Sequence, residues 1–317
     1  MRAQPHALRI ESPAMTEESR ARFAEEARAE RPDLVLLCLL IGFEAGLGEM
    51  TGLGGPRNGA GPAVDPLEAA LAPSLRALGQ LGALTAAALT AAGHAPGGPA
   101  GPPDPVGTAG LLAGVLGGSA DLRGGPAAYR RLESSLLHQV LRTGRGLPIT
   151  LSVVWIQVGR SLGLPVYGVA LPGHFVVGIG DPDGEYVLVD PFRGGRLLSG
   201  ADAEAVVAEA GYPLQPEMLR PAEPLDIVLR VLGNIRNWAA ARPEHARTQL
   251  WATELSLLLP RHPAQLRLER GELLVKTGRF TEGATELESY AQILDAFDPE
   301  SAQRVRLEAR AARHRLN

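Results

Sequence analysis

The chain has 317 residues, which is enough for two ordinary domains and a sizeable core. Its 31 lysines and arginines are interspersed with 35 aspartates and glutamates, and the net charge of −4 gives no basic footprint for nucleic acid. The one cysteine excludes an intrachain disulfide and, with no signal-type segment at the N-terminus, predicts a cytoplasmic protein.

Neither a membrane span nor a metal site is expected from the sequence. The most apolar uncharged run, residues 34–43, is well short of the roughly 20 residues that cross a bilayer. The histidines are scattered without the spacing of metal ligands, and no cysteine and histidine cluster exists for zinc. We therefore expect no metal and no other cofactor.

The N-terminal part of the chain reads as a polar tail followed by helices. Residues 1–17 are polar, contain two prolines and are expected to be disordered, and Met15 is an alternative start. Residues 18–108 are expected to form a helical region that is interrupted by loops rich in glycine and proline.

Two helices and two loops make up this region. A helical pattern over residues 18–46 is broken near Pro32, and its apolar second half should pack into a core. Residues 67–93 are rich in alanine and leucine and predict a second helix. The segments 47–66 and 94–106 are expected to be flexible loops.

A core region is expected over residues 109–200. A helical segment over 109–141 leads into a second helix, which Pro148 can open and Gly163 can close. One apolar face runs along this second helix with spacing i, i+3, i+4, i+7 and i+11, at Leu151, Val154, Trp155, Val158 and Leu162.

Three strands are expected after this helix, at residues 166–170, 174–179 and 186–190. The sequence Asp-Pro-Asp-Gly at 181–184 predicts the turn of an antiparallel hairpin between the last two strands. If Ile179 pairs with Glu185, then His174 lies directly opposite Asp190 on one face of the sheet.

Such a pair has a chemical meaning. A carboxylate that accepts the Nδ1 proton of a histidine leaves the other ring nitrogen able to take a proton from a nucleophile. The structural alternative is that His174 and Asp190 satisfy each other's polar groups at the edge of a core.

Four motifs carry a resemblance to a known family. They are RGLPITLS at 145–152, GLP at 163–165, PGHF at 172–175 and DPFRGGR at 190–196. Their order resembles that of the bacterial SirB-type proteins of the transglutaminase-like superfamily. A weaker upstream match spans 111–141, although Ser134 stands where the family would have asparagine. The resemblance implies an α+β fold with a papain- or transglutaminase-like core, in which a helix packs on a small antiparallel sheet, and largely helical N- and C-terminal regions.

The resemblance also implies where a nucleophile would stand. Active enzymes of the superfamily are expected to have a cysteine in the first turn of the core helix, where the helix dipole and the histidine lower its pKa. Here that position is Pro148, as the resemblance implies for the SirB-type branch itself. The catalytic set is therefore expected to be incomplete.

Three other residues are candidate nucleophiles. Cys38 lies in an apolar run and is either a reactive thiol or an inert buried one. Thr150 and Ser152 carry hydroxyls in the first turns of the core helix, where such residues also cap or pack.

Three arginines flank the motifs. Arg145, Arg193 and Arg196 could line a groove for an anionic or carboxylate-bearing ligand, since guanidinium groups bind carboxylates in a bidentate way. The alternative is that all three are solvated surface residues. Gly194 and Gly195 are expected to form a tight turn rather than a phosphate-binding loop.

Residues 201–317 are expected to be helical. Helices are predicted at 201–210, 227–241, 247–258, 265–277 and 281–297. Gly271, Gly278, Phe280 and Ala284 resemble a tetratricopeptide unit, which implies a concave surface for a peptide or, alternatively, a cap over the sheet.

Three functions remain open from the sequence. The first is a non-catalytic binding, scaffolding or regulatory protein, a possible pseudoenzyme, that keeps the histidine and aspartate pair. The second is an acyl-transfer or amide-hydrolysing enzyme that uses His174 and Asp190 with a hydroxyl or a water nucleophile. The third is a peptide-binding adaptor that acts through the C-terminal helices. The sequence favours the first.

Overall fold

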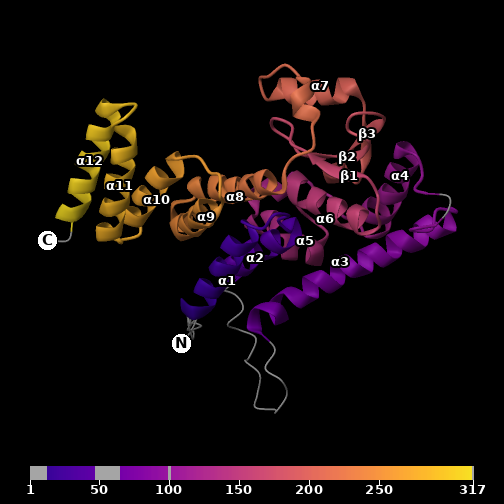
Figure 1. Cartoon of the computed structure of the whole chain (residues 1–317), viewed down its shortest axis with the longest axis horizontal. Helices are drawn as coiled ribbons and strands as arrows, with labels where there is room; N and C mark the ends of the chain where they lie inside the picture. Colours follow the sequence, from indigo (N-terminus) through magenta and orange to yellow (C-terminus); the bar gives the residue numbers. More distant parts are fainter. Residues whose placement is uncertain (1–12, 47–64, 99–100, 316–317) are drawn as a thin grey trace, which may run out of the picture. The chain divides into compact units, whose positions relative to one another are not determined.

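The computed structural model describes residues 13–46, 65–98 and 101–315. The chain divides into two compact units, one formed by residues up to Ala21 with Asp33–Val228 and the other by Arg22–Pro32 with Leu229–Asn317. The first unit joins helices to a four-stranded antiparallel sheet, so the predicted α+β class is confirmed (Figure 1).

Helices α1 (Pro13–Glu26) and α2 (Leu34–Gly46) begin the described chain. Helix α1 starts at Pro13, inside the segment 1–17 for which disorder is expected, and residues 1–12 lie outside the described part. Nearly every residue of α2 is buried, which explains its continuous apolar sequence. No helix of the described residues is long and apolar enough to cross a bilayer.

Helix α3 (Pro66–Ala91) follows the predicted 67–93 closely. Pro66 occupies its first position, and Oδ1 of Asp65 accepts a hydrogen bond of 2.8 Å from the Leu67 N–H, which caps the helix. The expected loop at 47–66 lies almost entirely outside the described residues.

The predicted helix over 109–141 is wrong in its middle. Its ends are helical, as α4 (Pro105–Leu112) with a π-helical extension η2 (Ala113–Ser119), and as α5 (Leu137–Thr143). Between them the chain forms only two 3₁₀ turns, η3 (Ala128–Arg130) and η4 (Leu132–Ser135). The Gly-Gly-Pro sequence at 124–126 breaks the helix here.

The core helix α6 (Pro148–Ser161) has the predicted limits. Proline starts it, Leu162 ends it, and Gly163 follows at a φ of +72°. The members of its apolar face that lie within the helix are buried, with Trp155 at 0% exposure, whereas Leu162 just beyond its end is half-buried.

The sheet has four antiparallel strands in sequence order. They are β1 (Val166–Val169), β2 (Val176–Gly180), β3 (Tyr186–Asp190) and β4 (Arg196–Leu198). In Figure 1 the sheet lies between α6 and α7 (Gly200–Glu209), a helix whose capping box pairs Ser199 with Asp202. A cluster of buried residues joins the sheet to α7, with Tyr167, Val169, Leu188 and Val207 among them.

The predicted register of the β2–β3 hairpin is wrong by two residues. Val177 pairs with Val189 and Gly180 with Tyr186, whereas the prediction paired Ile179 with Glu185. The Asp181 N–H donates to the carbonyl of Glu185 at 2.9 Å, so Glu185 is held further along the hairpin than expected. A shift of two keeps every side chain on its expected face.

The second unit is helical throughout its regular structure. Its helices are α8 (Pro224–Ala240, shared with the first unit), α9 (Ala246–Leu258), α10 (Gln265–Lys276), α11 (Phe280–Leu294) and α12 (Pro299–His314). Short 3₁₀ turns precede α8 and α9, at η6 (Pro216–Leu219) and η7 (Pro243–His245).

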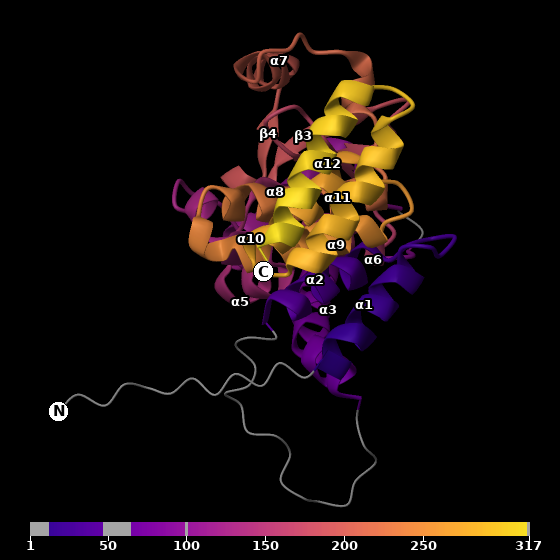
Figure 2. The ribbon, with the colours of Figure 1, turned by 90° about the vertical axis from the view of Figure 1, so that its left-hand side faces the viewer.

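Successive helices of this unit pack as pairs, and α11 lies beside α12 in both views (Figures 1 and 2). Close packing of α10 on α11 depends on glycine, since a Cβ on Gly271 would lie 2.8 Å from the Leu287 side chain. Helix α12 was not predicted, although Asp298 and Pro299 form an ordinary helix start: Asp298 accepts from the Ser301 N–H.

Candidate functional site

His174 and Asp190 are brought together beside the sheet. Nε2 of His174 lies 3.1 Å from Oδ2 of Asp190. His174 is not in β2 but two residues before it, at the end of a turn in which Gly173 has a φ of +74° and the His174 N–H donates to the Leu171 carbonyl. Continuing the register places Asp190 opposite Val176, so His174 reaches the carboxylate diagonally.

The ring nitrogen that Asp190 engages is Nε2, whereas the sequence argument used Nδ1. A carboxylate on either nitrogen fixes the tautomer and the ring orientation. The side chain of His174 keeps 14% exposure, while that of Asp190 keeps 2%. The pair is therefore a buried carboxylate with a histidine at the edge of the solvent.

Asp190 has further partners besides the histidine. Its Oδ1 accepts a hydrogen bond of 2.9 Å from the Phe192 N–H, which starts the short 3₁₀ turn η5 (Pro191–Arg193). Its Oδ2 lies 3.7 Å from Nε of Arg193, so the arginine and His174 share one oxygen. Both oxygens of this carboxylate are thus engaged, as expected for a buried charge.

Aromatic rings flank the histidine. The Phe192 ring meets the His174 ring edge to face at 6.3 Å, and the Tyr129 ring lies 5.7 Å from Phe192. Partial burial, and then the negative charge of Asp190, raise the pKa of the Tyr129 hydroxyl. We call the rings of Phe192 and Tyr129 the aromatic wall. Gly124 leaves room for it, since a Cβ there would overlap the Phe192 ring.

Sequence reasoning missed Tyr129. Its segment was expected to be part of a continuous helix, and only the Gly-Gly-Pro at 124–126 signalled that the chain turns there. Tyr129 is 56% exposed, so it is the accessible part of the aromatic wall.

The first turns of α6 hold no accessible hydroxyl. Pro148 is the first helical residue, as expected. The hydroxyl of Ser152 is buried and donates to the Pro148 carbonyl at 2.8 Å, the usual bond of a serine to the preceding turn. Thr150 is 1% exposed, and its Oγ1 has no hydrogen-bond partner among the described residues.

Cys38 is buried in the middle of α2. Burial, with a smaller effect from the charge of Asp33, raises the pKa of its thiol to about 12. The thiol is thus protonated at neutral pH, whereas the reactive form of cysteine is the thiolate.

The three candidate arginines do not converge on one groove. Arg145 pairs with Asp121 at 2.5 Å, and Arg196 pairs with Asp202 at 2.8 Å. Only Arg193 lies at the histidine and aspartate pair. Gly194 and Gly195 both have positive φ, of +66° and +89°, and turn the chain from η5 into β4.

The described residues contain no group of three or more histidine, cysteine, aspartate or glutamate side chains arranged to hold a metal ion. What the site offers chemically is an imidazole at the solvent edge that is oriented by a carboxylate. Such a group can accept or donate a proton, and it can equally hold a polar ligand.

Comparison with known proteins identifies the core. Residues 76–233 match the family model described as the transglutaminase-like superfamily. The chain therefore contains a domain of this type, and the expected transglutaminase-like core is confirmed.

Curated relatives match parts of the chain. A UPF0162 protein from Xylella fastidiosa strain Temecula1 is 34% identical over 174 residues, which are 52% of this chain and 60% of that protein. The UPF0162 protein PA3419 from Pseudomonas aeruginosa is 33% identical, over 35% of this chain and 41% of that protein. F-box only protein 21 from Homo sapiens is 24% identical, over 49% of this chain and 25% of that protein. The chain thus spans at most 60% of these relatives.

A solved structure of menin, described as revealing the binding site for the Mixed Lineage Leukemia (MLL) protein, is similar to this chain with a TM-score of 0.40. The match has 14% identity and covers 94% of this chain and 68% of that chain.

Proposed function

Because residues 76–233 form a transglutaminase-like domain, we propose that the protein is a non-catalytic member of that superfamily which binds or scaffolds a partner. The observation that carries this proposal is the start of α6, where Pro148 stands at the nucleophile position and the Ser152 hydroxyl is bonded back to its carbonyl. In this proposal His174 and Asp190 serve as a structural or ligand-holding pair.

The remaining candidate nucleophiles support the same proposal. An attacking group needs access to its substrate and a base within hydrogen-bond reach. Thr150 is buried in the helix, and Cys38 is a buried thiol with a raised pKa.

A covalent probe tests the proposal. Native protein is incubated with a fluorophosphonate for hydroxyls and with iodoacetamide for thiols, and intact mass is measured. We expect no adduct on the folded chain, so that treated and untreated protein have the same mass. The Ser152→Ala and Cys38→Ser variants should likewise have the same mass before and after treatment. A stoichiometric adduct that disappears in His174→Ala would overturn the proposal, because it would identify a nucleophile activated by that histidine.

A second candidate is an amide-hydrolysing or acyl-transfer enzyme with a water nucleophile. The supporting observation is the 3.1 Å contact that orients His174 while its side chain keeps some exposure. Its test is turnover of peptide, glutamine and simple amide substrates by the full chain. Activity that falls at least a hundredfold in His174→Ala and in Asp190→Asn would favour this candidate, and activity equal in all three proteins would exclude it.

A third candidate is a peptide-binding adaptor that uses the C-terminal helices. Its support is the packing of α10 on α11 and of α11 on α12 as successive pairs, which is the arrangement of tetratricopeptide-like repeats. Two apolar side chains of this unit are strongly exposed, Phe297 at 84% and Leu307 at 56%. Exposed apolar residues of this kind mark interaction surfaces when they lie together.

A peptide selection against the full chain tests this candidate. Selected peptides should bind the parent protein and lose affinity for a Phe297→Ser/Leu307→Ser double variant. Leu75→Ser is the matched control, since Leu75 is 50% exposed but lies on α3. Equal losses in both variants would argue against the C-terminal helices as the binding surface.

Two finer assignments belong with these proposals. We propose that the chain belongs to the SirB-type branch, because its four motifs occur in the order of that branch and proline is the first residue of the core helix. We place it in the cytoplasm because its single cysteine fits a reducing compartment.

A further inference from the structure

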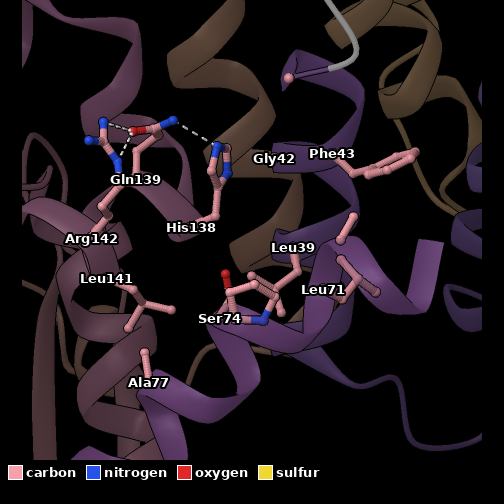
Figure 3. Close-up of a pocket in the computed structure, with 13 residues that line it drawn as sticks. Leu39, Gly42, Phe43, Leu71, Ser74, Ala77, His138, Gln139, Leu141 and Arg142 are labelled. Carbon is pink, nitrogen blue, oxygen red and sulfur yellow. Dashed lines mark hydrogen bonds between the residues drawn. The ribbon is translucent and has the colours of Figure 1, made fainter. Parts of the chain in front are cut away.

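A cavity of about 480 Å³ lies in the first unit, between α2, α3 and α5 (Figure 3). Its walls are mostly apolar, with Leu39 and Phe43 from α2, Leu71 and Ala77 from α3, and Leu141 from α5. Its volume is within the range of roughly 300–1,000 Å³ that is typical of small-molecule sites. The cavity shares none of its lining with the histidine and aspartate pair.

One wall of the cavity is polar. Oε1 of Gln139 accepts hydrogen bonds from Arg142, one of them from Nε at 3.0 Å, and its amide nitrogen lies 3.0 Å from Nε2 of His138 (Figure 3). Because the Gln139 amide donates to Nε2, the neutral His138 ring carries its proton on Nδ1. Burial, and then the charge of Arg142, lower the pKa of His138, which keeps the ring uncharged at neutral pH.

Arg142 is therefore the one charged side chain that lines the cavity. Its hydrogen bonds go to the neutral Gln139, and it forms no ion pair with any carboxylate in the described part of the chain. The neighbouring Arg145, by contrast, is paired with Asp121. The cavity thus combines an apolar interior with a single positive charge that has no anion.

The ring of His138 forms a fixed part of this wall. A Cβ on Gly42 would lie 2.2 Å from Nδ1 of His138, so the ring sits directly against the backbone of α2 where only glycine fits. The ring orientation is set from both sides, by Gly42 and by Gln139.

We propose that this cavity binds a small monocarboxylate with an apolar chain, whose hydrocarbon part fills the space between α2, α3 and α5 and whose carboxylate pairs with Arg142. A single guanidinium matches one negative charge, and its planar donors suit the two oxygens of a carboxylate. A phosphate dianion would leave a second negative charge uncompensated at an apolar wall. An amine would be repelled by the arginine.

Octanoate is the probe, and binding to the full chain is measured by isothermal titration calorimetry and by the shift in melting temperature. Octan-1-ol and octylamine have the same chain with a neutral and a positive head. We expect saturable binding of octanoate with one site per chain, and binding at least about tenfold weaker for both other compounds, since a hydrogen-bonded charge contributes at least about 1.4 kcal/mol, a factor of ten.

Two variants and one control locate the site. Arg142→Gln removes the charge from an exposed side chain and should weaken octanoate at least about tenfold, with little effect on octan-1-ol. Ala77→Phe fills the cavity and should abolish binding of both. Arg76→Gln is the matched control for the loss of one arginine charge. Arg76 is exposed on α3 next to Ala77 and does not line the cavity.

The proposal is overturned by any of three results: no saturable binding of octanoate to the parent protein, equal affinity for octanoate and octylamine, or octanoate affinity unchanged in Arg142→Gln. The Arg142→Gln arm remains decisive even if Ala77→Phe fails to fold. None of these readings depends on the histidine and aspartate pair, so they are independent of the proposed function.

Discussion

Gly195 lies against the indole of Trp155 so closely that a Cβ on the glycine would sit 2.4 Å from Cη2 of the ring. Gly195 follows the short turn after Asp190, whereas Trp155 is the fully buried centre of α6. The contact therefore joins the loop that carries the site to the core helix. A larger residue cannot replace this glycine without moving either the loop or the indole.

A Gly195→Ala substitution should destabilise the protein. The added methyl group overpacks the Trp155 ring, and φ at this position is +89°, which disfavours any side chain. We expect a loss of about 1–3 kcal/mol in the free energy of unfolding, measured by urea denaturation. Gly200→Ala is the control, since a Cβ there meets nothing within 4 Å. Equal stability of the two variants would contradict this account of the contact.

Truncating Trp155 should cost more stability than truncating His174. Trp155→Ala leaves a large void in a fully buried site, for which about 3–5 kcal/mol is typical. His174→Ala removes one partner of Asp190, which keeps Phe192 and Arg193, so about 1–3 kcal/mol is expected. Thermal melts of both variants decide the order. If His174→Ala is the more damaging, the pair is mainly a structural element and the enzyme candidate weakens.

Cys38 should be unreactive in the folded protein. Its thiol is buried and has a pKa raised to about 12, so neither access nor ionisation favours reaction at pH 8. With Ellman's reagent we expect no colour from native protein and one thiol per chain after denaturation in guanidinium chloride. Rapid reaction of one equivalent before denaturation would show that α2 opens or that the thiol is accessible.

Stability should fall in mildly acidic solution because of His138. Its pKa is lowered in the folded state, first by burial and then by Arg142, whereas in the unfolded chain it is near its ordinary value of about 6.5. The unfolded state therefore binds the proton more readily, and stability is lost as pH falls through about 6.5 towards the lower folded value.

The melting temperature is measured between pH 8 and pH 5 for the parent protein and for a His138→Gln variant, and the decrease over this range is compared. Glutamine does not titrate, so the variant should show a smaller decrease over the same range, even if its stability at pH 8 is lower. Parallel curves for the two proteins would mean that other groups cause the acid sensitivity.

Local signals predicted the core helix well and the hairpin less well. Pro148 and Gly163 fix the start and the end of α6, because proline suits a first helical position and glycine the positive φ that follows the helix. The hairpin register depends on which carbonyl the Asp181 N–H reaches, and the turn sequence alone leaves that choice open. The error of two residues still placed His174 and Asp190 on the correct face.

The segment between α4 and α5 shows what a single sequence cannot reveal. A helix is predicted across it, but Gly117 packs against the backbone of Gly194 and Gly124 against the Phe192 ring. These partners are about 70 residues away in the sequence. The Gly-Gly-Pro at 124–126 ends the helix locally, and the contacts of Gly117 and Gly124 with the loop after Asp190 show what the break permits, which only the folded chain reveals.

The engagement of both Asp190 oxygens has a consequence for the diagnosis of pseudoenzymes. The carboxylate fastens three pieces of chain, the end of β3, the turn η5 and the loop that carries His174. An aspartate that holds these segments together stabilises the fold whether or not the protein catalyses a reaction. In chains of this architecture a histidine and aspartate pair is therefore poor evidence for catalysis, and the residue that begins the core helix is the more informative one to inspect.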